Sequence, residues 1–353
     1  MKIQGYPNPG DGLRLHLNEN TGGCSPAVLD AIRRIRPADV SVYPSYRDAV
    51  LGCARHFDVD PDWILMTNGL DEGILMAAVG HIAHAGLHDA ETIIPQPAFD
   101  PYPNSTAAVG ATPVRVPPGR DYAFPTDAVL AAITPRTRLI FLNTPNNPTG
   151  QLIAIDDLVR ISEAAPHAIV LIDEAYIEFG GTTFLPRLSR HANVLVGRTF
   201  SKAYGLAGIR IGIVIGQPSA LDAVRAVTLP FNLNGVALAA TDAALADADF
   251  LPRYAAQVHE SRERLYAACT RLGLEFWKSA ANFVMVRVGE TAPFVDALAA
   301  KHIHVRDRSK DPTTPGCIRI TAGVVDHTNA AIEALEAVMA LRRGPAPAAR
   351  QKR

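Results

Sequence analysis

The sequence lacks any long apolar run, and this argues against a membrane-spanning segment. No stretch approaches the roughly 18 consecutive apolar residues at which a transmembrane helix is expected. The first twelve residues, MKIQGYPNPGDG, contain no apolar core and so do not resemble a secretory signal. These absences predict a cytoplasmic protein with no membrane partner.

An excess of charge of either sign is also missing. The chain has 34 Lys and Arg against 35 Asp and Glu residues, which gives a formal net charge of −1. Because nucleic acids and anionic membranes select basic surfaces, we expect neither as a partner.

Cysteine is scarce and unpatterned. The four cysteines are Cys24, Cys53, Cys269 and Cys317, and none of them forms a C-x-x-C motif or lies near a cluster of histidines. This spacing favours reduced thiols and predicts no metal site.

What the sequence does contain is an alternation of apolar strands with helices. Its 353 residues are enough for two domains. Continuous Val/Ile/Leu runs, as in RTRLIFLN, HAIVLID and NVLVGRTF, indicate strands covered on both faces. Their alternation with helices predicts an α/β fold with a mostly parallel central sheet.

The pattern of predicted helices and strands changes after about residue 245. A long amphipathic helix through PRYAAQVHESRERLYAACTRLG is followed by the shorter strands NFVMVRV and GCIRITAG, which indicates a smaller α+β domain. We therefore predict a large domain at 40–245 and a small domain made of 1–39 with 246–341. The Pro/Ala-rich, basic residues 342–353 are predicted to be a disordered tail.

Polar side chains follow successive strands of the predicted sheet. Asn147 follows one strand, Asp173 ends the next with Tyr176 shortly after it, and Lys202 lies between two further strands with Arg210 eight residues later. Open α/β sheets bind ligands at the carboxyl ends of their strands. Each of these residues alone is compatible with turn or surface chemistry, but their ordered combination indicates a single site.

Pyridoxal phosphate is the cofactor that uses this set of groups. It needs a lysine amine for a Schiff base, an acid at its pyridine nitrogen and donors to its phenolic oxygen. Its phosphate suits a helix N-terminus together with an arginine. The expected phosphate ligands are the backbone amides of Gly69, Leu70 and Asp71, the hydroxyls of Ser201 and Thr199, and Arg210.

At the level of motifs, the chain resembles the fold-type-I pyridoxal-phosphate aminotransferases, and most closely the histidinol-phosphate aminotransferases. The resemblance covers nearly the whole length and rests on an ordered series of motifs: LHLNENTGGCSP, YPSY, NGLDEGI, PQPAFDPY, TPNNPTG, IDEAYIEF, RTFSKAYGLAGIRIG and VRDRS…GCIRITAG. These motifs define the cofactor and the fold more closely than the substrate.

The resemblance implies a role for each matching residue. Lys202 would bond to the cofactor and then move the proton at the substrate's α-carbon. Asp173 would pair with the pyridine nitrogen, while Asn147 and Tyr176 would donate to the phenolic oxygen. Phe99 would stack on the ring.

Further implied roles concern the partner subunit and the substrate. Tyr43 would reach the phosphate of the neighbouring subunit's cofactor, so a homodimer with shared active sites is expected. Arg319 would bind the substrate's anionic group, with Asn20 and Gly22 beside it. Because Thr21-Gly22-Gly23 stands where the family has Pro-Tyr-Gly, a roomier and more mobile lid is expected.

The substrate remains open at this point. Arg319 suits an α-carboxylate or the phosphate of histidinol phosphate, and Arg306 and Arg308 are either additional phosphate ligands or solvated side chains. The leading prediction is transfer of an amino group from histidinol phosphate to 2-oxoglutarate. The alternatives are an aromatic or other amino-acid aminotransferase, a threonine-phosphate-type decarboxylase, and a non-catalytic regulator of the same fold.

Overall fold

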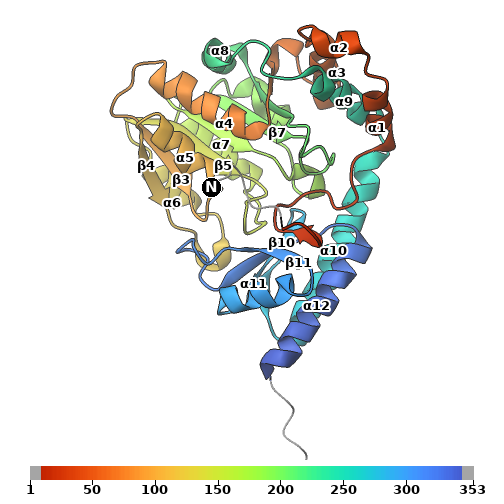
Figure 1. Ribbon diagram of the computed structural model, residues 1–353. Helices are drawn as coiled ribbons and strands as arrows, with labels where there is room; N and C mark the ends of the chain where they lie inside the picture. Colours follow the sequence, from red (N-terminus) through yellow and green to blue (C-terminus); the bar gives the residue numbers. More distant parts are fainter. Residues whose placement is uncertain (1–8, 344–353) are drawn as a thin grey trace, which may run out of the picture.

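The computed structural model describes residues 9–343, and residues 1–8 and 344–353 lie outside the described residues. The predictions for the first residues and for the tail at 342–353 therefore fall largely outside the described part. Helix α12 (Val325–Arg343) continues through the first two residues assigned to the tail. Figure 1 shows a larger sheet with its helices in the upper part of the molecule and a smaller sheet below it.

The larger sheet has seven strands in the order β2-β8-β7-β6-β5-β3-β4. Only β8 runs antiparallel to its neighbours, and the other pairs are parallel, so the predicted mostly parallel sheet is confirmed. The strands are β2 (Ile64–Thr67), β3 (Glu91–Pro95), β4 (Thr112–Val116), β5 (Thr137–Asn143), β6 (Ile169–Asp173), β7 (Val194–Thr199) and β8 (Gly212–Gly216).

Hydrophobic clusters cover both faces of this sheet. Along β5, Ile140 and Leu142 belong to one buried cluster, whereas Leu139 and Phe141 belong to the other. This explains the continuous apolar runs, because each successive side chain enters a core. The helices associated with this part are α2 (Pro37–Ser41), α3 (Arg47–Phe57), α4 (Leu70–Ala78), α5 (Pro101–Ala108), α6 (Thr126–Ala131), α7 (Ile155–Ala164), α8 (Pro218–Val227) and α9 (Gly235–Ala246).

The smaller sheet has five strands in the order β1-β11-β12-β10-β9. Its strands are β1 (Leu13–Leu15), β9 (Glu275–Trp277), β10 (Phe283–Arg287), β11 (Ile303–Asp307) and β12 (Cys317–Thr321). Helix α11 (Thr291–Ala299) packs on β11, and α10 (Phe250–Leu272) runs beside α12 (Figure 1). Strand β1 pairs parallel with β11 and comes from the N-terminal segment predicted to belong to the small domain.

The two sheets divide along the predicted domain lines with one difference. All strands of the larger sheet lie within residues 40–245, and all strands of the smaller sheet lie outside that range. Helix α1 (Pro26–Arg33), however, packs on α9, and its Val28 belongs to a cluster of the larger sheet. The assignment of all of residues 1–39 to the small domain therefore does not fit α1, because its buried residue faces the large-sheet core.

Within residues 9–343, no helix is long and apolar enough to cross a membrane. The four cysteines are free thiols, and burial raises the pKa of Cys53 and Cys269 to about 12. The part of the chain described here contains no group of His, Cys, Asp and Glu side chains arranged to hold a metal ion.

Candidate active site

The polar strand ends meet at one edge of the larger sheet. Asn143, the last residue of β5, pairs in register with Asp173, the last residue of β6, and Asp173 pairs with Gly197 of β7. Parallel strands that end together place their following loops side by side. This register brings the loop at Asn147 and the loop at Lys202 to the same place.

Most of the sequence-predicted residues line one cavity, which we call the inner cavity. Its walls include ten of the predicted residues: Leu70, Asp71, Phe99, Asn147, Asp173, Tyr176, Thr199, Ser201, Lys202 and Arg210. An adjoining outer cavity shares Lys202 with the inner one and is also lined by Arg306, Arg308 and Arg319.

Asp173 provides a buried carboxylate at the inner cavity. Its Oδ1 accepts a hydrogen bond from the Ala175 amide at 2.9 Å, and its Oδ2 accepts one from the Tyr102 hydroxyl at 2.6 Å. Burial raises the pKa of Asp173 to about 6, and the two hydrogen bonds oppose that rise. The carboxylate is therefore held ready for a cationic partner.

Lys202 provides the amine. It lies in the connection between β7 and β8, and its Nζ donates a hydrogen bond to the Leu17 carbonyl at 2.9 Å. Burial is the main cause that lowers the pKa of Lys202 to about 8, and the charge of Arg319 adds to it. A lowered pKa increases the fraction of neutral amine, which is the nucleophilic form.

Asn147 and Tyr176 present donors on the same side of the cavity. Oδ1 of Asn147 accepts a hydrogen bond from Arg319, so its Nδ2 is the group that can donate to a ligand. The hydroxyl of Tyr176 accepts from Nδ2 of Asn18 at 3.0 Å, which leaves its proton available for a ligand oxygen. Burial raises the pKa of Tyr176 to about 12, so this hydroxyl stays protonated at neutral pH.

The start of α4 and Arg210 form an anion site. Gly69 has φ of 77° and immediately precedes α4, whose first backbone amides have no partner within the helix. Arg210 contacts both Ser201 Oγ at 3.3 Å and Asp71 Oδ2 at 3.2 Å. A Cβ on Gly69 would lie 2.2 Å from the Arg210 guanidinium, so only glycine allows this close approach.

Phe99 lies at the inner cavity, whereas Tyr43 lies away from it. Phe99 lines the cavity and meets Tyr102 edge-on, with ring centroids 5.8 Å apart. Tyr43 does not line the cavity of its own chain; it is 78% exposed and stacks on Phe231 with centroids 4.3 Å apart. The described chain alone therefore does not bring Tyr43 to the site.

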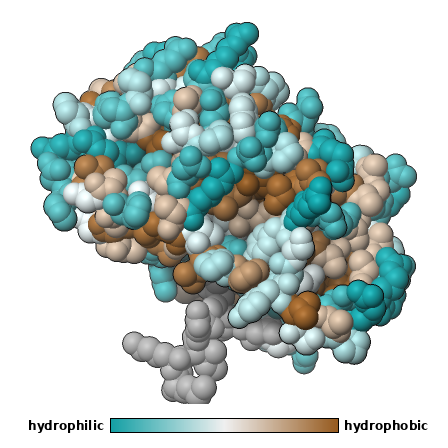
Figure 2. Space-filling model, turned by 90° about the horizontal axis from the view of Figure 1, so that it is seen from above, coloured by the Kyte–Doolittle hydropathy of each residue, from teal (hydrophilic) through white to brown (hydrophobic). Residues whose placement is uncertain are grey.

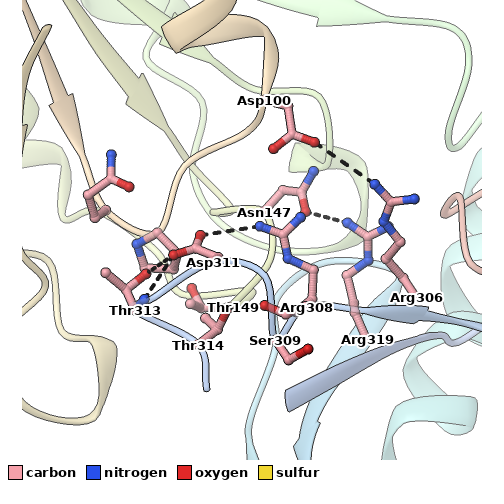
Figure 3. Close-up of polar contacts among 12 residues, drawn as sticks. Asp100, Asn147, Thr149, Arg306, Arg308, Ser309, Asp311, Thr313, Thr314 and Arg319 are labelled. Atoms are coloured by element: carbon pink, nitrogen blue, oxygen red, sulfur yellow. Dashed lines mark hydrogen bonds and ion pairs between the residues drawn. The ribbon is translucent and has the colours of Figure 1, made fainter. Parts of the chain in front are cut away.

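Arginines gather on the outer side of the site (Figure 3). Arg319 of β12 is buried and donates to Asn147 and to the His16 carbonyl, the latter at 2.8 Å. Arg306 of β11 lies 3.9 Å from Asp100, and Arg308 lies 3.4 Å from Asp311. Three guanidinium groups thus border the cavity that holds Lys202.

Two predicted residues of the N-terminal segment, Asn20 and Gly22, are not among those that line the two cavities. Asn20 Nδ2 donates to the Ala203 carbonyl at 3.0 Å, next to Lys202. A Cβ on Gly22 would lie 2.8 Å from a methyl group of Val324, so Gly22 serves close packing rather than a roomier lid. The Thr21 hydroxyl accepts from the Val324 amide at 2.9 Å, which ties down the segment expected to be mobile.

The residues of this segment that do line the outer cavity are Leu17, Asn18 and Glu19. Sequence reasoning missed them, although they stand in the same LHLNEN motif. Tyr102 was also missed. Its position three residues after Phe99, in PAFDPY, is the only signal that the sequence offers for it.

The donor set fits pyridoxal phosphate. The inner cavity offers a partly buried amine with a lowered pKa, a buried carboxylate, two donors for a phenolic oxygen, and a helix N-terminus with an arginine for a phosphate. Lys202, Asp173, Asn147, Tyr176 and Arg210 are the side chains that would hold the cofactor.

Comparisons with known proteins agree with this arrangement. The family model of class I and II aminotransferases matches residues 11–336. Over 341 residues the chain is 36% identical to histidinol-phosphate aminotransferase 2 of Pseudomonas fluorescens, which covers 94% of this chain and 90% of that protein. It is also 36% identical over 340 residues to an aromatic amino acid aminotransferase of Cutibacterium acnes, with 94% of each chain covered.

A solved structure shows the same fold. The crystal structure of the histidinol-phosphate aminotransferase from Sinorhizobium meliloti, in complex with pyridoxal 5'-phosphate, matches with a TM-score of 0.84 at 29% identity and covers 93% of this chain and 91% of that chain. Neither a decarboxylase nor a non-catalytic regulator is needed to account for these matches. The chain belongs to the class I and II aminotransferases and is an enzyme that transfers amino groups with pyridoxal phosphate.

Proposed function

We propose that this aminotransferase takes its amino group from histidinol phosphate and passes it to 2-oxoglutarate, giving imidazole acetol phosphate and glutamate, as a step of histidine biosynthesis. The observation that carries the proposal is the meeting of Arg306, Arg308 and Arg319 at the cavity that contains Lys202. The names of several relatives, including that from Pseudomonas fluorescens, support the same donor.

The number of arginines favours a phosphate over a carboxylate. A carboxylate is satisfied by one guanidinium fork, whereas a phosphate monoester carries more charge and a third acceptor oxygen. Arg308 donates a hydrogen bond to Asp311 Oδ2 at 3.4 Å, which is long for a charged pair. Its guanidinium group can therefore turn to an incoming dianion at modest cost.

Arg308 also has a hydrogen-bond donor without an acceptor within residues 9–343. Its side chain is 9% exposed, and its Nε–H is buried with no hydrogen-bond partner among the described residues. A buried donor without an acceptor costs on the order of 1–3 kcal/mol. Because Arg308 lines the outer cavity, a movement of its side chain toward a substrate anion would let this donor find an acceptor.

Pyridoxal phosphate, when bound, supplies the electron sink that makes the proton on the substrate's α-carbon removable. Lys202 provides the amine that accepts and returns this proton, since burial lowers its pKa to about 8. Asp173 holds a proton at the ring nitrogen, and Asn147 and Tyr176 orient donors toward the phenolic oxygen. Phe99 closes the inner cavity with an aromatic face.

We also propose that the working unit is a homodimer. Exposed apolar side chains at Val40, Val42, Tyr43, Leu229 and Phe231 come from two neighbouring segments, joined by the stacked Tyr43–Phe231 pair. Figure 2 shows the molecule from above, the side on which α2 lies, with hydrophobic residues set into a hydrophilic surface. A second copy of the chain would cover such a patch and would receive Tyr43 at its phosphate site.

An aromatic amino donor is the second candidate, because relatives at similar identity carry that name. A panel of amino donors assayed with 2-oxoglutarate separates the two. Histidinol phosphate should give the highest kcat/KM, well above phenylalanine and tyrosine. Equal or better turnover of phenylalanine would refute the proposed donor while leaving the aminotransferase assignment intact.

A further inference from the structure

The hydroxyl of Tyr102 reaches Asp173 from outside the inner cavity. Tyr102 Oη donates to Oδ2 of Asp173 at 2.6 Å, a length typical of a hydrogen bond to a charged oxygen. Asp173 lines the inner cavity and Tyr102 does not, so Tyr102 acts on a ligand only through the carboxylate. The roles proposed above make no use of Tyr102.

The ring of Tyr102 is held firmly in place. It is 2% exposed and stacks on Phe141 of β5 with centroids 4.8 Å apart and an interplanar angle of 13°. Phe99 meets it edge-on, and Pro101 occupies the first position of α5, where proline fixes the backbone. With its ring fixed by these contacts, the hydroxyl keeps a constant position relative to Asp173.

The hydrogen bond from Tyr102 opposes the groups that raise the pKa of Asp173. Burial, Asp71 and Glu174 all raise the pKa of Asp173, whereas Tyr102 and the Ala175 amide lower it. Tyr176, the other titratable group beside this carboxylate, stays protonated, and the pKa of Tyr102 itself is raised well above its ordinary value by burial. Tyr102 is thus a permanent donor, and among residues 9–343 it is the only side chain that donates to the carboxylate of Asp173.

We propose that Tyr102 is a positioning residue whose hydroxyl keeps Asp173 a weak base, so that the proton shared with the cofactor's ring nitrogen stays on the nitrogen. A proton on the ring nitrogen strengthens the electron sink. Without the hydroxyl, the carboxylate binds the shared proton more tightly and the ring nitrogen becomes more nearly neutral. This inference rests on the proposed pairing of Asp173 with the ring nitrogen.

The test uses holoenzyme loaded with pyridoxal phosphate that is ¹⁵N-labelled in the ring. The nitrogen chemical shift reports the protonation of the ring directly and is independent of turnover. Tyr102→Phe removes only the hydroxyl and keeps the stacked ring. Tyr266→Phe is the matched control, because Tyr266 is also buried and stacked, on Phe276, but its hydroxyl bonds to the backbone of Ser279.

We expect the ¹⁵N signal of Tyr102→Phe to move toward that of a neutral pyridine, while Tyr266→Phe keeps the wild-type shift. We also expect kcat to fall about tenfold in Tyr102→Phe and to change less than twofold when the same substitution is added to Asp173→Asn. An unchanged ¹⁵N shift, or an equal loss of kcat in both backgrounds, would overturn the role of Tyr102.

The Asp173→Asn variant distinguishes failure of the Tyr102 proposal from failure of the proposed pairing of Asp173 with the ring nitrogen. If Asp173→Asn leaves the ¹⁵N shift at the wild-type value, then Asp173 does not face the ring nitrogen and both assignments fail. If Asp173→Asn moves the shift and Tyr102→Phe does not, only the role of Tyr102 fails. Loss of stability in Tyr102→Phe without a change in the ¹⁵N shift would show a purely structural contact and would count against the proposal.

Discussion

Arg319 donates a hydrogen bond to Oδ1 of Asn147, and this bond joins the arginine proposed to hold the substrate to a residue beside the cofactor site. The two residues are 172 positions apart: Arg319 lies on β12 of the smaller sheet, and Asn147 lies in the loop after β5 of the larger sheet. A second bond from Arg319, to the His16 carbonyl at 2.8 Å, fixes the plane of the guanidinium. The binding group is therefore oriented before a substrate arrives, which lowers the cost of binding.

This orientation predicts that Arg319→Lys is not a conservative change. A lysine keeps the charge but cannot make the two fixed contacts and a fork to an anion together. We expect kcat/KM for the amino donor to fall roughly 10- to 100-fold, the cost of one or two charge-assisted hydrogen bonds. Arg342→Lys is the control, because Arg342 also donates to a carbonyl and lies over a phenylalanine ring. An equal loss in both variants would contradict the assignment of Arg319.

Lys202→Ala should abolish covalent attachment of the cofactor. Reduction of the loaded protein with borohydride, followed by mass spectrometry of the denatured chain, should show a pyridoxyl group in the wild type and none in the variant. Lys301→Ala, which changes an exposed lysine, should keep the modification. A pyridoxyl group on the Lys202→Ala chain would contradict the assignment of Lys202 as the amine that binds the cofactor.

Arg308→Gln should separate phosphate-bearing donors from the rest. Within the protein, the substitution removes one long side-chain hydrogen bond, from Arg308 to Asp311 at 3.4 Å. We expect kcat/KM for histidinol phosphate to fall about tenfold and that for phenylalanine to change less than twofold. Lys310→Gln, a change of charge in the same loop but outside the outer cavity, should affect neither. An equal loss of kcat/KM for both donors would show that Arg308 supports the fold rather than the recognition of the phosphate.

Asp173→Asn should stabilise the protein without cofactor at neutral pH. Burial raises the pKa of Asp173 from 3.8 to about 6, so the stability linked to its protonation is present below pH 3.8 and is lost as pH rises through 6. Asparagine avoids this loss, which amounts to at most about 3 kcal/mol. Urea unfolding at pH 4 and at pH 7.5 measures it. A variant that is no more stable than the wild type at pH 7.5 would contradict the raised pKa.

Phe231→Asp should dissociate the proposed dimer. A charge placed against Tyr43 in the apolar patch opposes burial by a second copy. Light scattering after size exclusion should show twice the chain mass for the wild type and one chain mass for the variant, together with weaker cofactor binding. Leu341→Asp, an equally drastic change of an exposed apolar residue on α12, should leave the mass unchanged. A wild-type protein that is itself a monomer would end the dimer proposal.

The strand-end residues could be identified from the sequence because two local signals coincide there. Asp173 ends a continuous apolar run and Thr199 ends the neighbouring strand, and parallel neighbours bring such ends to one edge. The helix that begins after Gly69 predicts an anion site, because the first backbone amides of a helix have no partner within it. These inferences need no knowledge of distant contacts.

Other parts of the site depend on contacts between segments that are far apart in the chain. Lys202 and Leu17 are separated by 185 residues, and Asn18 and Thr321 by 303. The periodicity of a short stretch of sequence cannot reveal contacts between residues so far apart in the chain. Strand β1 spans only three residues, too few to show alternation, so the sequence pattern does not reveal its pairing with β11.

The proposed cofactor-binding residues Lys202 and Arg210 and the proposed substrate-binding arginines come from different sheets and their connections. Because β8 pairs antiparallel with β7, Lys202 and Arg210 come from one short connection, and their spacing is set by two hydrogen-bonded strands. The arginines at 306, 308 and 319 belong to the other sheet and its β11–β12 connection. On the proposed roles, grafting residues 305–316 from a relative with another donor should change the donor specificity while the connection that carries Lys202 and Arg210 stays intact.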